Sequence, residues 1–367
     1  MRILASASPG EVRVAAVADG VPVDFALDRP GAPDGVGDLH RGRVVARMPA
    51  LAGSFVRLAG ADGFLPDSEA PAGLDEGSVL GVRIVRAPQG GKGPRLTARL
   101  SEAERALVGA GAPALLQRGP GAIARFATLF ADAPVLLDDA ALCAELRPAL
   151  GDRLVRVPRA FDAALEGQIE ALGDASADLP GGVRMTVHPT PALTAIDVDL
   201  AAASAGRGSK TRNHEAANRA AIPDIARQIR LRNLAGPILV DFAGLSAKRR
   251  SGLGEALAAA LAQDPLRPRF LGFSALGLAE ILRPRLHPPL HELLAGPHAA
   301  GLSALRRLAA EIAATPARAP ALAAAPAVVA ALQADAVALG NLAQRAGRPL
   351  MLRQDPALAP LGWRIED

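Results

Sequence analysis

The chain has very few of the residues that build disulfides, metal clusters and aromatic cores. Its 367 residues include one cysteine, one tryptophan, no tyrosine and three lysines. Because Cys143 is alone, the sequence excludes an internal disulfide and any zinc or iron–sulfur site made from several cysteines. The chain also lacks the uninterrupted apolar run of about 20 residues that a transmembrane helix needs. Its first residues show no long apolar secretion signal, so we expect a cytoplasmic protein without a membrane span.

Arginine is what the chain has in excess. It supplies 38 of the 41 basic residues, and the net charge is +4 at pH 7. A guanidinium forms forked hydrogen bonds to phosphate, so this bias permits a nucleic-acid partner. A GC-rich genome enriches alanine, arginine, glycine and proline together without any functional cause, so composition leaves the partner open. The length predicts two or three domains.

Short strands dominate the first hundred residues. Residues 1–35 indicate one or two strands, and a run of short strands separated by glycine turns follows from about residue 38 to 100. The predicted strands of this run are Gly42–Met48, Ser54–Leu58, Gly63–Leu65, Val79–Arg86 and Arg95–Arg99. Five short strands within about 60 residues are typical of an OB-type barrel.

Beyond Ser101 the pattern alternates between strands and helices, which predicts an α/β layer with a mostly parallel sheet. A long helix is predicted over Asn213–Leu234, and Pro223 is expected to kink or split it. We also predict a short helix over Leu276–Arg283 and a linker over Thr315–Pro326, where alanine and proline are frequent.

Two aspartates stand at the ends of predicted apolar strands. Asp197 follows Leu193–Ile196 and Asp241 follows Ile238–Val240. Ligands of open α/β sheets bind at the carboxyl ends of strands, and two carboxylates there can hold Mg²⁺. Asp199 lies two residues after Asp197 and should point to the same face. The alternative is that these aspartates only cap the loops that follow the strands.

The segment between the two aspartates is strongly basic. Residues 204–235 carry a net charge of +5, from Arg207, Lys210, Arg212, Arg219, Arg227, Arg230 and Arg232 against Glu215 and Asp224. A cationic helix beside a carboxylate pair suits a polyanionic substrate. A solvated helix face is the commoner meaning of such a charge run.

A third candidate site lies in the predicted barrel. Strand alternation places Val56 and Leu58 on one face of their strand and Phe55 and Arg57 on the other. Exposed rings beside cations are what single-stranded nucleic acid needs, because rings stack bases and cations follow the phosphates. Phe64 repeats the pattern, and a glycine-flanked loop adds Lys92. The alternative places both phenylalanines in the core, and the choice depends on the strand register.

Several segments, in order, resemble the ribonuclease E/G family. Ala192–Asp199 is similar to the strand that carries this family's first metal aspartate, and Ile225–Leu234 to its signature helix. Gly236 and Ile238–Phe242 follow at the family spacing as the second metal strand. Further similar segments are Asn218, Phe273–Glu280, Gly42–Val44, Ser54–Val56, Gly63–Pro66 and Lys92–Thr97. The resemblance covers roughly residues 1–295.

The resemblance implies an α/β, multi-domain fold. An OB-fold RNA-binding barrel (37–100) would interrupt a split RNase H-like subdomain (1–36 and 101–190). A DNase I-like catalytic subdomain (191–298) and a small Ala/Pro-rich C-terminal unit (299–367) would follow. Membership implies Mg²⁺-dependent cleavage of single-stranded RNA, with Mn²⁺ as a substitute metal. Asp197 and Asp241 would be the metal ligands with Asp199 assisting. The RNA-binding residues would be Phe55, Phe64, Lys92, Arg57, Arg43, Arg95, Arg227, Arg230 and Asn218.

The sequence also departs from the family pattern. Asp199 replaces the usual asparagine, and Gly244 replaces an acidic residue three positions after Asp241. Residues 100–115 are too few for the subdomain that senses the RNA 5′-phosphate, and the Cys-Pro-x-Cys zinc link is absent. We expect no zinc, no 5′-end sensing, and only dimers that form without the zinc link.

The sequence leaves three functional hypotheses. The first is an endoribonuclease for rRNA or mRNA processing or decay that leaves 5′-phosphate and 3′-hydroxyl ends. The second is an RNA-binding protein that keeps the fold with weakened or no catalysis. The third is a nuclease directed at DNA. A salt-sensitive binding to single-stranded RNA is common to the first two, so cleavage in the presence of metal distinguishes them.

Overall fold

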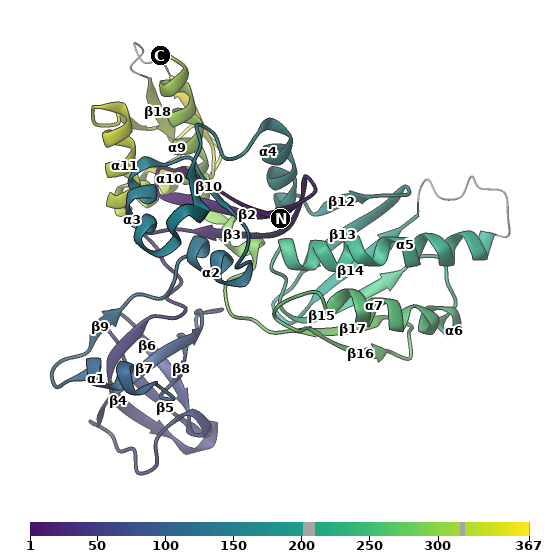
Figure 1. The fold of residues 1–367 in the computed structure, drawn as a ribbon, viewed down its shortest axis with the longest axis horizontal. Helices are drawn as coiled ribbons and strands as arrows, with labels where there is room; N and C mark the ends of the chain where they lie inside the picture. Colours follow the sequence, from purple (N-terminus) through teal and green to yellow (C-terminus); the bar gives the residue numbers. More distant parts are fainter. Residues whose placement is uncertain (201–209, 316–319, 367) are drawn as a thin grey trace. The chain divides into compact units, whose positions relative to one another are not determined.

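The computed structural model describes residues 1–200, 210–315 and 320–366 (Figure 1). It divides into two compact units. One combines Met1–Pro33, Ala122–Arg283 and Pro289–Asp367, and the other combines Asp34–Gly121 with Pro284–Pro288. The second unit is therefore an insertion in the chain of the first, and each unit is described separately below.

The inserted unit is a closed five-stranded barrel, as predicted. Its strands are β4 (Leu39–Met48), β5 (Gly53–Arg57), β6 (Asp62–Pro66), β7 (Val79–Arg86) and β8 (Arg95–Thr97). They close in the order β4-β5-β6-β8-β7-β4, with β6 and β8 parallel and the other neighbours antiparallel. Alternate residues of each strand point inward and fill the barrel, among them Val44, Val56, Leu65, Val82 and Leu96. A helix, α1 (Glu102–Val108), and a strand, β9 (Ala114–Gln117), complete the unit.

The chain segments before and after this insertion together form one five-stranded sheet. Its strands are β1 (Arg2–Ser8), β2 (Glu11–Ala18), β3 (Val21–Asp28), β10 (Val135–Leu137) and β11 (Leu154–Arg156), in the order β11-β10-β1-β2-β3. The first three form an antiparallel meander, and β10 and β11 run parallel to β1. Residues 1–35 thus hold three strands where the pattern indicated one or two. The helices of this part are α2 (Ala122–Leu129), α3 (Ala140–Leu150) and α4 (Ala163–Glu170).

A six-stranded sheet carries the two candidate metal aspartates. It contains β12 (Ser176–Leu179), β13 (Val183–Pro189), β14 (Thr194–Asp199), β15 (Gly236–Phe242), β16 (Arg269–Phe273) and β17 (Ala279–Arg283), in the order β12-β13-β14-β15-β17-β16. Only β14 and β15 are parallel. The prediction of a mostly parallel sheet is wrong, because the short connections between β12, β13 and β14 and between β16 and β17 permit only antiparallel pairing.

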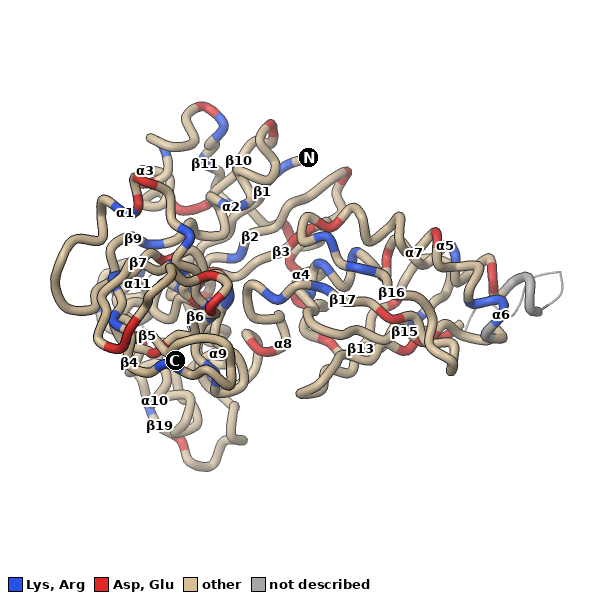
Figure 2. Tube along the Cα trace, turned by 90° about the horizontal axis from the view of Figure 1, so that it is seen from below, with Lys and Arg blue, Asp and Glu red and all other residues tan. Residues whose placement is uncertain are grey.

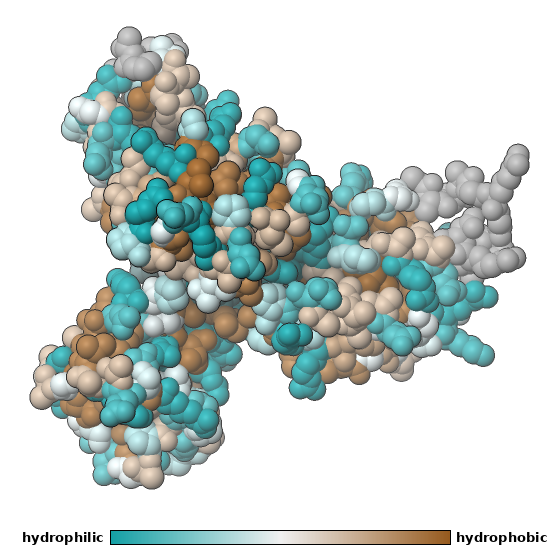
Figure 3. Space-filling model, viewed as in Figure 1, coloured by the Kyte–Doolittle hydropathy of each residue, from teal (hydrophilic) through white to brown (hydrophobic). Residues whose placement is uncertain are grey.

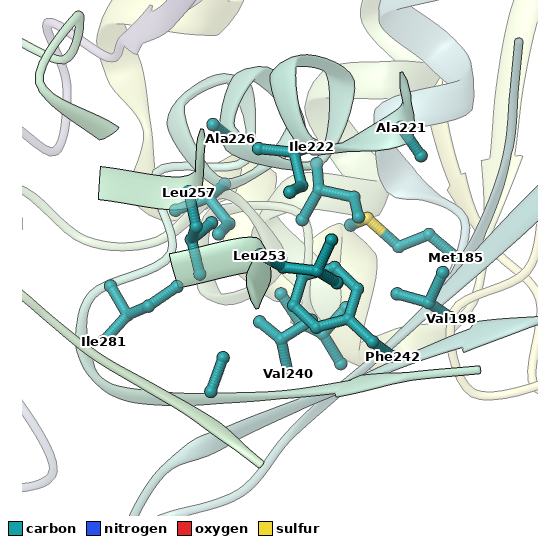
Figure 4. Packing of buried hydrophobic residues seen from close by; sticks show 14 of the residues in the cluster. Met185, Val198, Ala221, Ile222, Ala226, Val240, Phe242, Leu253, Leu257 and Ile281 are labelled. Atoms are coloured by element: carbon teal, nitrogen blue, oxygen red, sulfur yellow. The ribbon is translucent and has the colours of Figure 1, made fainter. Parts of the chain in front are cut away.

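Helices cover one face of this sheet. They are α5 (Lys210–Leu231) and α7 (Gly254–Leu261), and the short α6 (Ala247–Arg250) lies in the connection from β15 to α7. The long connection through α5 is what allows β14 and β15 to run parallel. Figure 4 shows the resulting core, in which Ile222 of α5 and Leu257 of α7 face Val198, Val240 and Phe242 of the sheet. Because side chains alternate along a strand, the residues between these buried ones point to the opposite face.

Two helix predictions need correction in this region. Helix α5 continues through Pro223, which is exposed, so the proline removes a backbone hydrogen bond to residue 219 without splitting the helix. Leu276–Arg283 is not a helix, because Ala279–Arg283 forms β17 with Ala279, Ile281 and Arg283 turned to the buried face. The apolar run was too short to separate a helix from a strand by its period.

The C-terminal part forms a small layer with its own core. It contains α8 (Leu290–Leu293), α9 (Gly296–Ala314), α10 (Pro326–Ala334) and α11 (Ala336–Ala346), and a sheet ordered β19 (Leu352–Gln354), β18 (Ala321–Ala324), β20 (Trp363–Glu366). The predicted linker is therefore wrong at its end, since β18 is the buried central strand. Among the described helices none alone has the length and apolarity to cross a membrane. Only α10 and α11 together meet that test, and they are bent by 86°.

Candidate functional site

Asp197 and Asp241 lie directly opposite each other. They are register partners on the parallel pair β14 and β15, one step along from the pair Ile196 and Val240. Since Ile196 and Val240 are buried under the helices, the two carboxylates point to the uncovered face of the sheet. Asp197 is exposed and the Asp241 side chain is 48% exposed. The structure thus brings together the two residues predicted as metal ligands.

Asp199 shares this face but has different neighbours. Its carboxylate accepts a hydrogen bond from the Leu200 amide at 2.7 Å, and its register partner is Arg184 on β13. The pKa of Arg184 is raised by its hydrogen bond and ion pair with Asp178 and, to a smaller extent, by the charge of Asp199. In the described parts of the chain no three His, Cys, Asp or Glu side chains form a metal-binding group.

The pair nevertheless suits Mg²⁺ by the chemistry of its donors. Mg²⁺ keeps several waters and binds proteins through one or two carboxylates together with substrate phosphates, so two facing aspartates on an exposed sheet face fit such a site. A basic residue stands beside one of them, because Arg250 of α6 places its Nη1 2.6 Å from Oδ1 of Asp241. Figure 2 marks the basic positions of α6 in blue.

Gly244 occupies the position where the family pattern has an acid, and its surroundings leave no room for one. Its φ is +65°, in the left-handed region that favours glycine. A Cβ built on it would lie 2.0 Å from Nδ1 of His214 on α5. The loop after β15 therefore cannot supply a third carboxylate without a local rearrangement.

Replacing Gly244 by alanine should destabilise the protein more than replacing Gly236 by alanine. Both glycines have positive φ, but a Cβ on Gly236 meets nothing within 4 Å. Gly236→Ala should cost about 1–2 kcal/mol of backbone strain, and Gly244→Ala should add about 1–3 kcal/mol of overpacking. The free energies of unfolding from urea titrations measure both. Equal losses would show that His214 moves aside at no cost.

Asn218 is fully buried, at 0% exposure, and its side chain braces the same loop. Its Nδ2 donates to the carbonyls of His214, at 2.8 Å, and Ala243, at 2.9 Å. The amide therefore ties α5 to the end of β15. This position does not offer the side chain to RNA, in contrast to the prediction.

The basic residues in the second half of α5, and Arg232 just after it, are also engaged within the fold. Arg227 pairs with Asp224 at 2.6 Å, and Arg230, only 12% exposed, pairs with Asp24 of β3 at 2.7 Å. Burial raises the pKa of Asp24 although Arg230 opposes the shift. Arg232 is 5% exposed and donates to Gln228 at 3.0 Å. These contacts join the helix to its neighbours and hold the guanidinium groups of Arg227 and Arg230, both predicted to bind RNA, in ion pairs within the fold.

The segment has four other basic residues. Arg207 and the side chains of Lys210 and Arg212 lie outside the described residues. Arg219 is exposed and donates to the carbonyl of Gly252 at 2.8 Å.

The barrel carries the predicted aromatic pair on its outer surface. Val56 and Leu58 point into the barrel, so Phe55 points outward, where it is register partner to Phe64 of β6. The two rings are half-buried and meet edge to face, with centroids 5.7 Å apart and planes at 67°. The Phe64 ring lies against Gly53, where a Cβ would come within 2.4 Å of the ring edge. Of the two alternatives, the structure therefore shows the phenylalanines on the outside of the barrel and not in its core.

The four basic residues predicted to bind RNA on the barrel lie in the same unit as this pair. Arg95 of β8 is the register partner of Phe64, and Arg43 of β4 is that of Arg57. Arg57 is ion-paired with Asp62, whose hydrogen bonds raise the pKa of the guanidinium, and Arg43 donates to the Gly77 carbonyl at 3.1 Å. Lys92 is exposed just after a tight two-glycine turn. Figure 3 shows hydrophobic and hydrophilic residues intermixed on the visible side of the barrel unit.

The sequence pattern missed two further arginines near Arg95. Arg86 lies opposite Arg95 because the β7–β8 register shifts between Ile84 and Arg86, and alternation alone cannot reveal such a bulge. Arg285 belongs to the segment whose Leu286 carbonyl accepts from the Ala87 amide at 2.8 Å. The pKa of Arg86 is lowered by burial and by the positive charges of Arg95 and Arg285.

Comparisons with known proteins agree with the earlier resemblance. A family model described as the ribonuclease E/G family matches residues 140–286. Ribonuclease E of a Nostoc species is 38% identical over 143 residues, 36% of this chain and 20% of that protein. Ribonuclease E of Escherichia coli is 38% identical over 129 residues, 35% of this chain and 12% of that protein. Ribonuclease G of Escherichia coli is 24% identical over 400 aligned positions, 80% of this chain and 81% of that protein. The matched part thus spans a fifth or less of these ribonuclease E proteins.

Proposed function

We propose that the chain, which matches the ribonuclease E/G family model over residues 140–286, is an endoribonuclease that cuts single-stranded RNA in rRNA or mRNA processing or decay. The observation that carries the proposal is the facing pair Asp197 and Asp241 on the uncovered face of the six-stranded sheet. An RNA substrate is also consistent with the three expectations from the sequence, namely a cytoplasmic protein, no zinc ion and no membrane span.

In this proposal Asp197 and Asp241 hold a Mg²⁺ ion, or Mn²⁺ in its place. When bound there, the metal lowers the pKa of a coordinated water and offsets negative charge that builds on the phosphate. Asp197 and Asp241 orient the ion from two strands whose positions the core beneath them fixes. Asp199, beside Arg184, adds negative potential on the same face without lying opposite either ligand.

The barrel supplies the proposed grip on RNA. Phe55 and Phe64 present aromatic surface for stacking, and Arg43, Arg57, Arg95 and Lys92 provide cations for the phosphates. Stacking on a ring tolerates any base but requires it to be unpaired, so this surface favours single strands over duplexes.

The chemical identity of the product ends tests the proposal. Hydrolysis of the phosphodiester by attack of water should leave a 5′-phosphate and a 3′-hydroxyl. Mass spectrometry of fragments from a defined single-stranded oligoribonucleotide in Mg²⁺ measures both ends. Products with 2′,3′-cyclic phosphate would instead show attack by the neighbouring ribose hydroxyl and would contradict the proposed role of the aspartates. A DNA strand of the same sequence, tested in parallel, separates an RNA-directed from a DNA-directed nuclease.

A second candidate function is RNA binding without cleavage. It is favoured by two features of the acidic site, the pairing of Asp241 with Arg250 and the replacement of an acid by Gly244. This candidate predicts the same salt-sensitive binding to single-stranded RNA but intact RNA after prolonged incubation with Mg²⁺.

A further inference from the structure

Asp241 is held by a cation of the protein itself. Nη1 of Arg250 lies 2.6 Å from its Oδ1, on an aspartate that is otherwise half exposed. Arg250 is only 15% exposed, so the guanidinium approaches the carboxylate from the protein side and leaves the outer side to solvent. Asp197, its partner across the strands, has no ion pair within the described residues.

Arg250 is fixed in this place by two backbone carbonyls. Its Nε donates to the carbonyl of Leu245 at 3.0 Å, and its Nη1 donates to that of Gly277, in the β16–β17 turn, at 3.2 Å. The arginine therefore belongs to the local fold of the site. Its neighbour Arg249 differs, because it is 48% exposed and pairs with Glu215 of α5 at 3.3 Å.

A guanidinium at this distance and a divalent cation on the same carboxylate repel each other. Mg²⁺ binds carboxylate oxygens at about 2.0–2.1 Å, so a metal on either oxygen of Asp241 would lie within a few ångströms of Arg250. Gly244 offers no third carboxylate to outweigh this repulsion.

We propose that Arg250 is a built-in competitor of the divalent cation for Asp241. It neutralises Asp241 while no metal is bound, and it raises the metal concentration at which the site fills. The inference rests on the proposed metal site at Asp197 and Asp241 and adds the residue that sets its affinity. The metal occupies the site fully only when the guanidinium has moved away from the carboxylate.

Binding of Mn²⁺ tests the inference without any measurement of RNA cleavage. The loss of the free Mn²⁺ signal in electron paramagnetic resonance gives the affinity of the full chain. Arg250→Gln should bind Mn²⁺ about tenfold more tightly than the wild type. Arg249→Gln removes the same charge one residue away and should change the affinity less than twofold. Arg250→Lys keeps a charge but loses the planar fork, and it should bind more tightly than wild type but less tightly than Arg250→Gln.

The outcomes separate the two proposals. If the wild type binds Mn²⁺ and Arg250→Gln binds no more tightly than Arg249→Gln, the inference fails and the metal site stands. If neither the wild type nor any folded Arg250 variant binds Mn²⁺, the proposed metal site itself is wrong. Adding Asp241→Asn to Arg250→Gln should weaken Mn²⁺ binding to the wild-type level or below. Binding that stays as tight as in Arg250→Gln would place the metal elsewhere and overturn the inference.

Discussion

Replacing Phe55 and Phe64 together by alanine should weaken binding of single-stranded RNA by a factor of about 30 or more. Each stacked base is worth about 1–3 kcal/mol in alanine substitutions, so the loss of two stacking rings removes about 2 kcal/mol at the least. The rings are half-buried on the outside of the barrel, where they contact each other and leave surface for bases. Fluorescence anisotropy of a labelled oligoribonucleotide measures the change.

The control for this prediction is Leu107→Ala. Leu107 is a 52% exposed apolar residue of α1 in the same unit and lies outside the aromatic pair. The dependence of the binding constant on salt is a second control, because its slope counts phosphates neutralised and should not change when rings are removed. A double variant that keeps its circular dichroism spectrum and binds RNA as the wild type does would contradict the assignment of this surface.

Replacing Glu11 by glutamine should cost about 3–5 kcal/mol of stability. Glu11 is 3% exposed and holds two arginines, Arg29 at 3.0 Å and Arg306 of α9 at 2.8 Å. Burial and the positive charge of Arg13 lower the pKa of Arg306, and the charge of Glu11 opposes this shift. Removal of one side of a buried ionic group leaves the other charge uncompensated, and that accounts for the size of the loss.

Glu311→Gln is the matched control for Glu11→Gln. Glu311 lies on the same helix as Arg306 and pairs with Arg307 at 3.8 Å, but both of these side chains are exposed. An exposed pair of this kind contributes about 0.3–0.5 kcal/mol or less. Urea unfolding followed by the fluorescence of Trp363, in β20 of the C-terminal layer, reports on the region that Arg306 joins. Equal losses for the two variants would contradict the structural role of Glu11.

Local alternation was enough to predict the barrel and the acidic pair. In Ser54–Leu58 one register buries Val56 and Leu58, and the same register turns Phe55 outward. The strands that end near Asp197 and Asp241 are short apolar runs whose buried residues alternate with the aspartates. These predictions depend on the alternation within each strand and on the short glycine turns between strands, and both are local in the sequence.

The pairing of the sheet and the partners of the arginines depend on contacts between distant segments. The mostly parallel sheet was wrong because turn lengths, and not strand composition, decide the direction of β13, β16 and β17. The arginines of α5 form one charged run in the sequence, yet Arg230 meets Asp24 more than 200 residues away. Arg250 follows Lys248 and Arg249 in the sequence, and only the fold shows that it meets Asp241.

A Mg²⁺ titration of RNA cleavage by the wild type and Asp197→Asn tests the central claim most directly. Asparagine keeps the shape of the side chain and removes the charge that the metal needs, on an exposed residue whose replacement leaves the core untouched. We predict that the wild type cuts single-stranded RNA with a rate that rises with Mg²⁺ and saturates, and that Asp197→Asn is slower by about 10²-fold or more. Equal, metal-independent residual cleavage by both proteins would contradict the account.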